Sequence, residues 1–146
     1  MARTKLACPK TFIFNTQLPV RVTDLNYANH LANDAVLSLL HEARLRFLNQ
    51  YFQVSEADVG EGLGLIMADS VIVYKSQGFY GDVLDIAMTV TVTDVSAYSF
   101  DIFYLLQIAA KKQEIVRAKT TLVSFDYQKR TLVRLPKDFR QALLAG

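Results

Sequence analysis

Several features that would assign this chain to a specialised class of protein are missing from it. It has one cysteine, Cys8, which cannot form an internal disulfide, so nothing requires an oxidising compartment. Its 16 basic and 14 acidic residues leave a net charge of only +2, which gives no general affinity for nucleic acid. No apolar run reaches the roughly 18 residues of a membrane span, and the basic N-terminus lacks the apolar core of a signal peptide. We therefore expect a cytoplasmic protein with no nucleic-acid partner and no membrane span.

The motifs of several large enzyme classes are also missing. The sequence has no Gly-rich phosphate loop of the P-loop or dinucleotide type and no Gly-x-Ser-x-Gly nucleophile elbow. Its two histidines, His30 and His41, stand far apart with no cysteine nearby, which is not the spacing of a zinc shell. We therefore expect no metal site and no bound cofactor.

What the chain does have is the composition of a folded protein. It has 146 residues, of which 51% are hydrophobic and 21% charged. A chain of this length can bury a sizeable core, and the composition is not that of a disordered segment. It contains no internal repeat and no Pro/Gly-rich linker, so we expect one domain over residues 1–146.

One long helix is predicted from Ala35 to about Phe52. Apolar residues recur there at helical spacing, and further leucines widen the stripe. Asn33 or Asp34 is a candidate cap for its first turn. A helix that is apolar on so many sides is expected to be buried on most of them, against or within a sheet.

The rest of the chain is predicted to be mainly strands. Thr11 to Val22 reads as a first strand, with Pro19 indicating an edge or irregular position. After the helix come four stretches rich in Val, Ile, Thr, Tyr and Phe, namely Leu65 to Lys75, Val83 to Thr93, Ala97 to Ala109 and Glu114 to Tyr127. A short helix is predicted from Pro136, where proline is allowed at an early position. Strands that follow one another after a single helix indicate an α+β fold with an antiparallel sheet.

The segment most informative about function leads into the long helix. It runs from Asp24 to Asp34 with the sequence DLNYANHLAND, and it concentrates acid, amide and imidazole groups at the helix entrance. A helix N-terminus presents unpaired N–H groups and a partial positive charge. Such a position can hold an anion or a polarised carbonyl oxygen.

These residues resemble a known family of enzymes, the hotdog-fold acyl-CoA thioesterases similar to 4-hydroxybenzoyl-CoA thioesterase. The family's loop is similar to D-x-D-x-x-G-H-x-N-N and leads to a helix that carries E-A-R about two turns later. The matching residues here are Asp24, Asn26, Asn29, His30, Leu31, Ala32 and Asn33, followed by Glu42, Ala43 and Arg44. Residues 74–84 (YKSQGFYGDVL) and 123–140 are similar to later family segments. The resemblance covers nearly the whole chain and implies an antiparallel sheet wrapped around one central helix.

The resemblance also implies roles for the loop residues, with one departure. In the family the thioester carbonyl points at a backbone N–H where the helix begins, which corresponds to Asn33 here; the alternative for Asn33 is a plain helix cap. The family's second aspartate, often its catalytic carboxylate, is Asn26 in this chain, and an amide is neither a nucleophile nor a general base. Asn26 can still position water or bond the carbonyl, or it can simply form the turn.

Two carboxylates are candidates to replace the missing acid, and a histidine is a candidate to assist them. Asp34 is nearest to the helix entrance, and its alternative is a first-turn acid favoured by the helix dipole. Glu42 corresponds to the helix carboxylate that some hotdog thioesterases use, and its alternative is an ion pair with Arg46. His30 can orient a water or bond the substrate or the loop. Asp24 is expected to hold the shape of the loop.

The resemblance therefore implies hydrolysis of an acyl thioester, with coenzyme A present only as part of the substrate. Lys75 and Arg130 are candidates to meet its phosphates. The family's pairing of sheets implies a homodimer, or a homotetramer built from two dimers. The alternative prompted by Asn26 is a non-catalytic protein that binds acyl-CoA or an acyl carrier. A hotdog hydratase fits less well, because four residues separate its Asp and His, whereas five separate Asp24 and His30, and Asn26 is not an acid.

Overall fold

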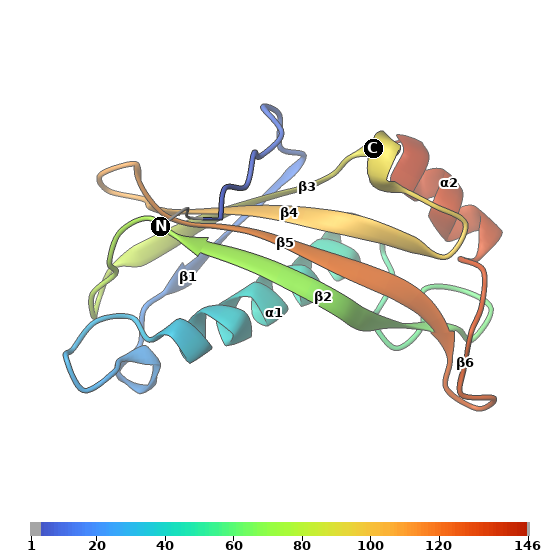
Figure 1. Ribbon diagram of the computed structural model, residues 1–146, viewed down its shortest axis with the longest axis horizontal. Helices are drawn as coiled ribbons and strands as arrows, with labels where there is room; N and C mark the ends of the chain where they lie inside the picture. Colours follow the sequence, from blue (N-terminus) through green and yellow to red (C-terminus); the bar gives the residue numbers. More distant parts are fainter. Residues whose placement is uncertain (1–3, 146) are drawn as a thin grey trace.

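An antiparallel sheet curls around one long helix in the computed structural model, which describes residues 4–145 (Figure 1). The strands lie in the order β1-β3-β4-β5-β2, and β6 pairs with β5. Their bounds are β1 Phe14–Pro19, β2 Gly64–Tyr74, β3 Val83–Val90, β4 Ser99–Ile108, β5 Gln113–Asp126 and β6 Thr131–Leu132. The helices are α1 Asn33–Gln50 and α2 Lys137–Ala145, with short 3-10 turns η1 Val22–Asp24 and η2 Val92–Asp94. This is the predicted α+β hotdog architecture.

The helix α1 packs its apolar face against the inside of the sheet. Phe47 and Leu48 are fully buried, and the ring of Phe47 stacks on Phe14 of β1 at 5.2 Å between centroids. Each such side chain stabilises the fold by about 1.5–3 kcal/mol through burial. Leu37 and Leu45, however, stay 44% and 40% exposed on the outer face, so the chain alone covers less of the helix than its broad apolar stripe predicts.

The helix α1 begins at Asn33, two residues before its predicted start at Ala35. Asn33 is already the first residue of α1, and Ala32 occupies the N-cap with an extended backbone. The prediction that Asn33 or Asp34 caps the helix is therefore wrong, and no side chain caps α1 at all. The reason is that the N–H of Ala32 donates to the carbonyl of Asp24 at 2.8 Å, so backbone pairing within the loop sets where the helix begins.

The first strand is shorter than predicted, whereas the four later strands agree closely with their predicted ranges. β1 ends at Pro19, and Val22 already belongs to η1. β2 forms one edge of the sheet and pairs with β5, with a bulge between Met67 and Asp69. Residues 67–70 lie exposed along this edge. η2 and the two-residue strand β6 were not predicted, because segments this short carry no periodicity.

A buried polar chain ties α1 to the middle of the sheet. Arg44 is 3% exposed; its Nε donates to Glu56 at 3.3 Å and its Nη1 to the Tyr104 hydroxyl at 3.5 Å. The Tyr104 hydroxyl in turn lies 2.7 Å from that of Thr120. Burial raises the pKa of the Tyr104 phenol, although the Arg44 guanidinium acts in the opposite direction. The phenol therefore stays neutral and can donate to Thr120 while it accepts from Arg44.

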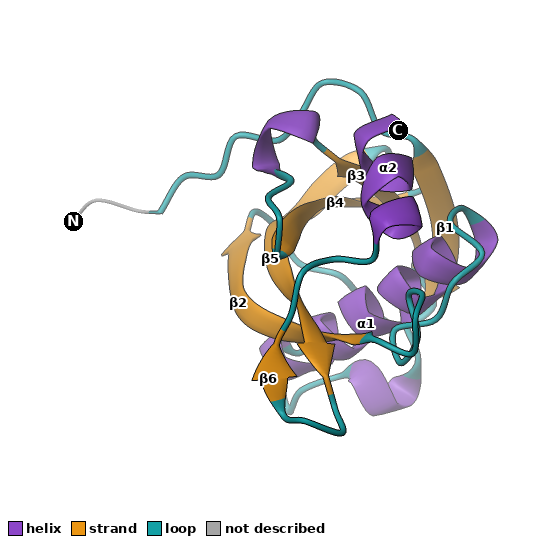
Figure 2. Cartoon of the chain, turned by 90° about the vertical axis from the view of Figure 1, so that its right-hand side faces the viewer, coloured by secondary structure: helices purple, strands orange, loops and turns teal. Residues whose placement is uncertain are grey.

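Different elements lie at the two ends of the curled sheet. Figure 2 shows α2 at one end, where the ring of Phe139 packs edge-on against Phe52 and Phe100 at 5.7 and 5.5 Å. The N-terminus of α1 lies at the other end, together with the loop between β2 and β3 (Figure 1). Aromatic rings therefore pack α2 onto the first end of the sheet, whereas loops form the second end.

Candidate active site at the N-terminus of the long helix

Asp24 anchors the loop that leads into α1. Its carboxylate is buried and accepts the backbone N–H of Arg21 at 2.8 Å, while the Arg21 guanidinium donates to it at 3.3 Å. Its own carbonyl accepts from Ala32, as described above. Asp24 thus holds the loop at both ends, which is the structural role expected from the sequence.

Asn26 folds the middle of the loop into a tight turn. Its Oδ1 accepts the backbone N–H groups of Ala28 at 2.9 Å and of His30 at 3.1 Å, and its own N–H donates to the carbonyl of His30 at 2.8 Å. Asn29 adopts a left-handed backbone, with φ of 63°, which asparagine tolerates better than most residues. Two backbone N–H donors face one side-chain atom of Asn26, which identifies that atom as the oxygen Oδ1. The side-chain nitrogen Nδ2 takes no part in these bonds.

His30 is held between this loop and the loop that follows β2. It forms a β-bridge with Phe79, and the two rings meet edge to face at 5.1 Å. The next residue, Leu31, donates its N–H to the carbonyl of Gly78 at 2.8 Å. A Cβ at Gly78 would lie 3.3 Å from the Leu31 side chain, so this close approach of the two loops favours glycine.

These two loops and the start of α1 line an open cavity of about 310 Å³. It is lined by Asn26, His30, Leu31, Asn33, Tyr74, Lys75, Ser76 and Gln77. The Tyr74 hydroxyl donates to the carbonyl of Asn33 at 3.4 Å, which joins the end of β2 to the first turn of α1. Four of the residues predicted from the sequence thus meet in one place: Asn26, His30, Asn33 and Lys75. Tyr74, Ser76 and Gln77 were not predicted as site residues, and their sequence signals were their place at the end of a strand and in the segment 74–84 that resembles the family.

The first turn of α1 gives this cavity its electrostatic character. The helix has 18 residues and no side-chain cap, so the N–H groups of its first turn are free of side-chain partners. Lys75 adds a cation to the lining of the cavity. Among residues 4–145, no aspartate or glutamate lines the cavity. The arrangement can stabilise negative charge on an oxygen that enters it.

The structure places both candidate helix carboxylates outside this cavity. Asp34 faces a separate hollow beside Asp24 and Ser38. Glu42 accepts a hydrogen bond from Arg46 at 2.9 Å, which is the ion-pair alternative expected from their spacing. Arg46 also donates to Thr16 and to the carbonyl of Gln17, so this pair fastens α1 to β1.

Arg130 and Lys75 lie at opposite ends of β2. Lys75 follows the end that pairs with Val116, whereas Arg130 follows the end of β5 that pairs with Gly64. Eleven residues of strand separate these ends, which is roughly 35 Å at about 3.3 Å per residue. Within one chain the two cations therefore do not converge on one phosphate-bearing ligand.

The described part of the chain contains neither a metal-binding cluster nor a membrane-spanning helix. Over residues 4–145, no three His, Cys, Asp or Glu side chains gather in a way that could hold a metal ion. Over the same range, no helix combines the length and the apolar character needed to cross a membrane.

Comparison with known proteins gives one consistent family. A model of the thioesterase-like superfamily matches residues 20–143. The structure is similar to a 1,4-dihydroxy-2-naphthoyl-CoA thioesterase from Synechocystis, with 25% identity, a TM-score of 0.78 and coverage of 89% of this chain and 94% of that chain. It is also similar to a probable thioesterase from Escherichia coli, with 22% identity, a TM-score of 0.75 and coverage of 89% and 96%.

A more distant structural neighbour is a 12:0-ACP thioesterase from Umbellularia californica. It shares 13% identity at a TM-score of 0.75, and the match covers 89% of this chain and 49% of that chain. No protein of curated function matches the chain. The family match spans the loop, α1 and strands β2 to β6, and the chain therefore belongs to the thioesterase-like superfamily.

Proposed function

We propose that this protein hydrolyses acyl-CoA thioesters in the cavity at the N-terminus of α1. One observation carries the proposal: the uncapped first turn of α1 opens, at Asn33, into the same cavity as His30 and Lys75. Membership of the thioesterase-like superfamily supports thioester hydrolysis. The Synechocystis neighbour is named for a CoA thioester, which supports coenzyme A as the carrier.

The proposed reaction assigns each step to a group in the cavity. The thioester carbonyl oxygen accepts the N–H of Asn33, so the negative charge that develops on it faces the positive end of α1. His30 accepts a proton from water as the water oxygen bonds to the carbonyl carbon, because a neutral imidazole nitrogen is a proton acceptor and no carboxylate of residues 4–145 lines the cavity. The carbon–sulfur bond then breaks, and the protonated imidazole returns the proton to the leaving thiolate. The products are a free carboxylic acid and coenzyme A.

Thiol release from a panel of acyl-CoA substrates tests this proposal. His30→Gln is expected to lower kcat by about 100-fold to 10,000-fold, the usual contribution of a general base. His41→Gln is the matched control, because His41 is exposed on α1 and contacts Glu56 at 3.4 Å, away from the cavity. Equal turnover in the two variants, both folded by circular dichroism, would contradict the role of His30.

A second candidate function is binding of acyl thioesters without hydrolysis. The specific observation in its favour is that Asn26 replaces the family's aspartate and that no carboxylate lines the cavity within residues 4–145. Tight binding of a CoA thioester by calorimetry, with no thiol released from any member of the panel, would establish this function and refute hydrolysis.

We also propose that two copies of the chain assemble through β2. This strand is an edge of the sheet, and residues 67–70 lie exposed along it. An exposed edge strand is a template for pairing with another strand, and the exposed Leu37 and Leu45 of α1 add apolar surface that a second copy can cover. Sedimentation at micromolar concentration is expected to give a dimer, or a tetramer of two dimers. A folded species that sediments as a monomer would refute the assembly.

A further inference from the structure

A group of exposed lysines lies beside the cavity, at the tip of the β4–β5 hairpin. The hairpin turn carries Lys111 and Lys112, and both are exposed. The backbone N–H of Lys75, which lines the cavity, donates to the carbonyl of Ile115 at 2.8 Å. Lys112 precedes Ile115 by three residues, which is about 10 Å of extended chain at about 3.3 Å per residue. The hairpin tip and the cavity wall are therefore neighbours.

The positive charge of these lysines is not neutralised by the acids around them. Within residues 4–145, the six ion pairs of the structure include neither Lys75, Lys111 nor Lys112. The nearby Glu114 is already paired with Arg117. Asp82 accepts the backbone N–H of Phe79 at 2.9 Å and keeps its own negative charge, which offsets only one of the three lysines. This end of the molecule consequently presents an excess of positive charge beside the cavity.

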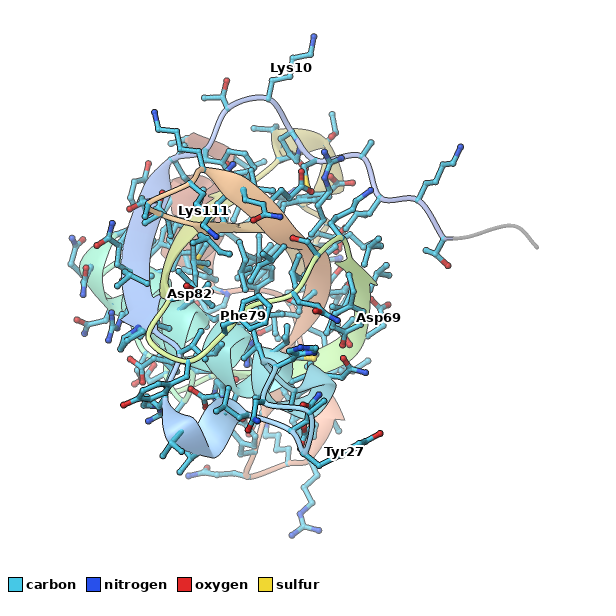
Figure 3. The ribbon with its side chains drawn as sticks, turned by 90° about the vertical axis from the view of Figure 1, so that its left-hand side faces the viewer. Lys10, Tyr27, Asp69, Phe79, Asp82 and Lys111 are labelled. Carbon is cyan, nitrogen blue, oxygen red and sulfur yellow. The ribbon has the colours of Figure 1, made fainter. Side chains whose placement is uncertain are left out.

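Two aromatic rings stand exposed on the loop next to these lysines. Phe79 is 46% and Tyr80 67% exposed. Their loop is held by the Asp82 contact, by the bridge from Phe79 to His30, and by the N–H of Gly81, which donates to the carbonyl of Val20 at 3.1 Å. Figure 3 looks onto this end and shows Phe79 and Lys111 on the same face. Exposed rings on a fixed loop offer flat surfaces on which a planar base can stack.

We propose that Lys75, Lys111, Lys112, Phe79 and Tyr80 form a subsite for the phosphorylated nucleotide of coenzyme A. The lysines meet the phosphates, and the rings stack on the adenine. The inference rests on the proposed function in one respect, because the acyl end of the same molecule occupies the cavity. An acyl-carrier protein would offer acidic side chains to the lysines but no base to the rings, and the combination of the two favours the nucleotide.

Binding of 3′-phosphoadenosine 5′-phosphate, measured by calorimetry at low salt, tests the subsite without requiring turnover. We expect the double variant Lys111→Ala/Lys112→Ala and the single variant Tyr80→Ala each to weaken binding by about tenfold or more, equivalent to about 1.4 kcal/mol. The double variant Lys129→Ala/Lys137→Ala is the control, because these exposed lysines follow β5 and begin α2 and lie outside the subsite. The control is expected to bind like the wild type.

Kinetics with two forms of the substrate complete the test. With acyl-CoA, the Lys111→Ala/Lys112→Ala variant should have a KM raised by about tenfold at unchanged kcat, since the lost contacts are remote from the reacting carbon. With the same acyl group on pantetheine, its KM should equal that of the wild type. Unchanged nucleotide affinity in this variant would overturn the subsite, whether or not the protein hydrolyses thioesters. Impaired turnover of an acyl-carrier-protein substrate, with acyl-CoA turnover intact, would overturn it in favour of a carrier protein. Weakened nucleotide binding in a protein without hydrolysis would support the subsite and refute only the proposed function.

Discussion

Asn26→Asp is the substitution that most directly tests how this cavity works. The side-chain oxygen of Asn26 accepts two backbone N–H groups of its loop, at 2.9 and 3.1 Å. A carboxylate keeps one oxygen in that position and puts a second oxygen where the amide nitrogen stands. The loop should therefore keep its shape, while the cavity that Asn26 lines gains the carboxylate of the family pattern. We expect acyl-CoA hydrolysis to rise, by about 100-fold where the new carboxylate acts as a general base.

Two companion variants separate the effect of the carboxylate from that of the loop. Asn26→Ala loses both hydrogen bonds, which lowers the free energy of unfolding by about 1–3 kcal/mol at about 0.5–1.5 kcal/mol for each bond. In domains slightly larger than this one, each kcal/mol of lost stability lowers Tm by about 2–4 °C. Asn29→Asp adds the same charge to the same loop at an exposed position outside the cavity. We expect a normal Tm for Asn26→Asp, a lowered Tm for Asn26→Ala and no rate gain for Asn29→Asp.

The result that would refute this account is a fall in rate for a folded Asn26→Asp. A fall would mean that the amide nitrogen of Asn26 donates a hydrogen bond to the substrate, so that the asparagine is itself part of the reaction. A rate gain shared equally by Asn29→Asp would refute it differently, because it would assign the effect to net charge and not to a base in the cavity.

The other predictions concern groups outside the cavity. Arg44→Met should lower the free energy of unfolding in urea by about 3 kcal/mol, since it leaves Glu56 without its guanidinium partner; a loss below 1 kcal/mol would contradict the importance of this buried contact. Asp34→Asn and Glu42→Gln should keep wild-type turnover, and the latter should cost only about 0.3–0.5 kcal/mol for its exposed ion pair; a collapse of kcat in either would return that carboxylate to the reaction. Burial raises the pKa of the Cys8 thiol, so the thiolate forms only at higher pH, and maleimide at pH 8 should modify Cys8 more slowly than free cysteine.

The fold could be predicted from the sequence because its main elements carry clear periodic patterns. Helical spacing of apolar residues marks α1, and runs of β-branched and aromatic residues mark β2 to β5. Element ends were harder to place, because they depend on contacts between segments. The first strand ends at Pro19, and α1 begins at Asn33 because the backbone of Ala32 pairs with that of Asp24. Neither boundary is encoded by local propensity alone.

The site could be predicted in part, for a similar physical reason. Asn26, His30 and Asn33 are close in sequence, so a loop that enters a helix brings them together whatever the rest of the fold does. Lys75 joins them only because β2 ends beside that loop. The resemblance to a known family implied this arrangement, and the composition of the chain could not have predicted it. Arg130 was grouped with Lys75 from charge alone, and the antiparallel pairing of β2 with β5 puts it at the far end.

The separation of the two helix carboxylates from the cavity follows from the phase of α1. Each residue turns the helix by about 100°, so Asp34 already points away from the direction of Asn33, and Glu42 lies about two and a half turns further on, on the opposite side. The positions that return to the direction of Asn33 fall near Leu40 and Arg44, one apolar and one a cation, and both are buried. A thioester carbonyl held at the start of α1 therefore meets no carboxylate of its own helix, and within one chain the proton acceptor has to come from the loop. His30 is the group in that loop with the chemistry to serve, which is why the comparison of His30→Gln with His41→Gln decides whether the cavity hydrolyses its ligand or only binds it.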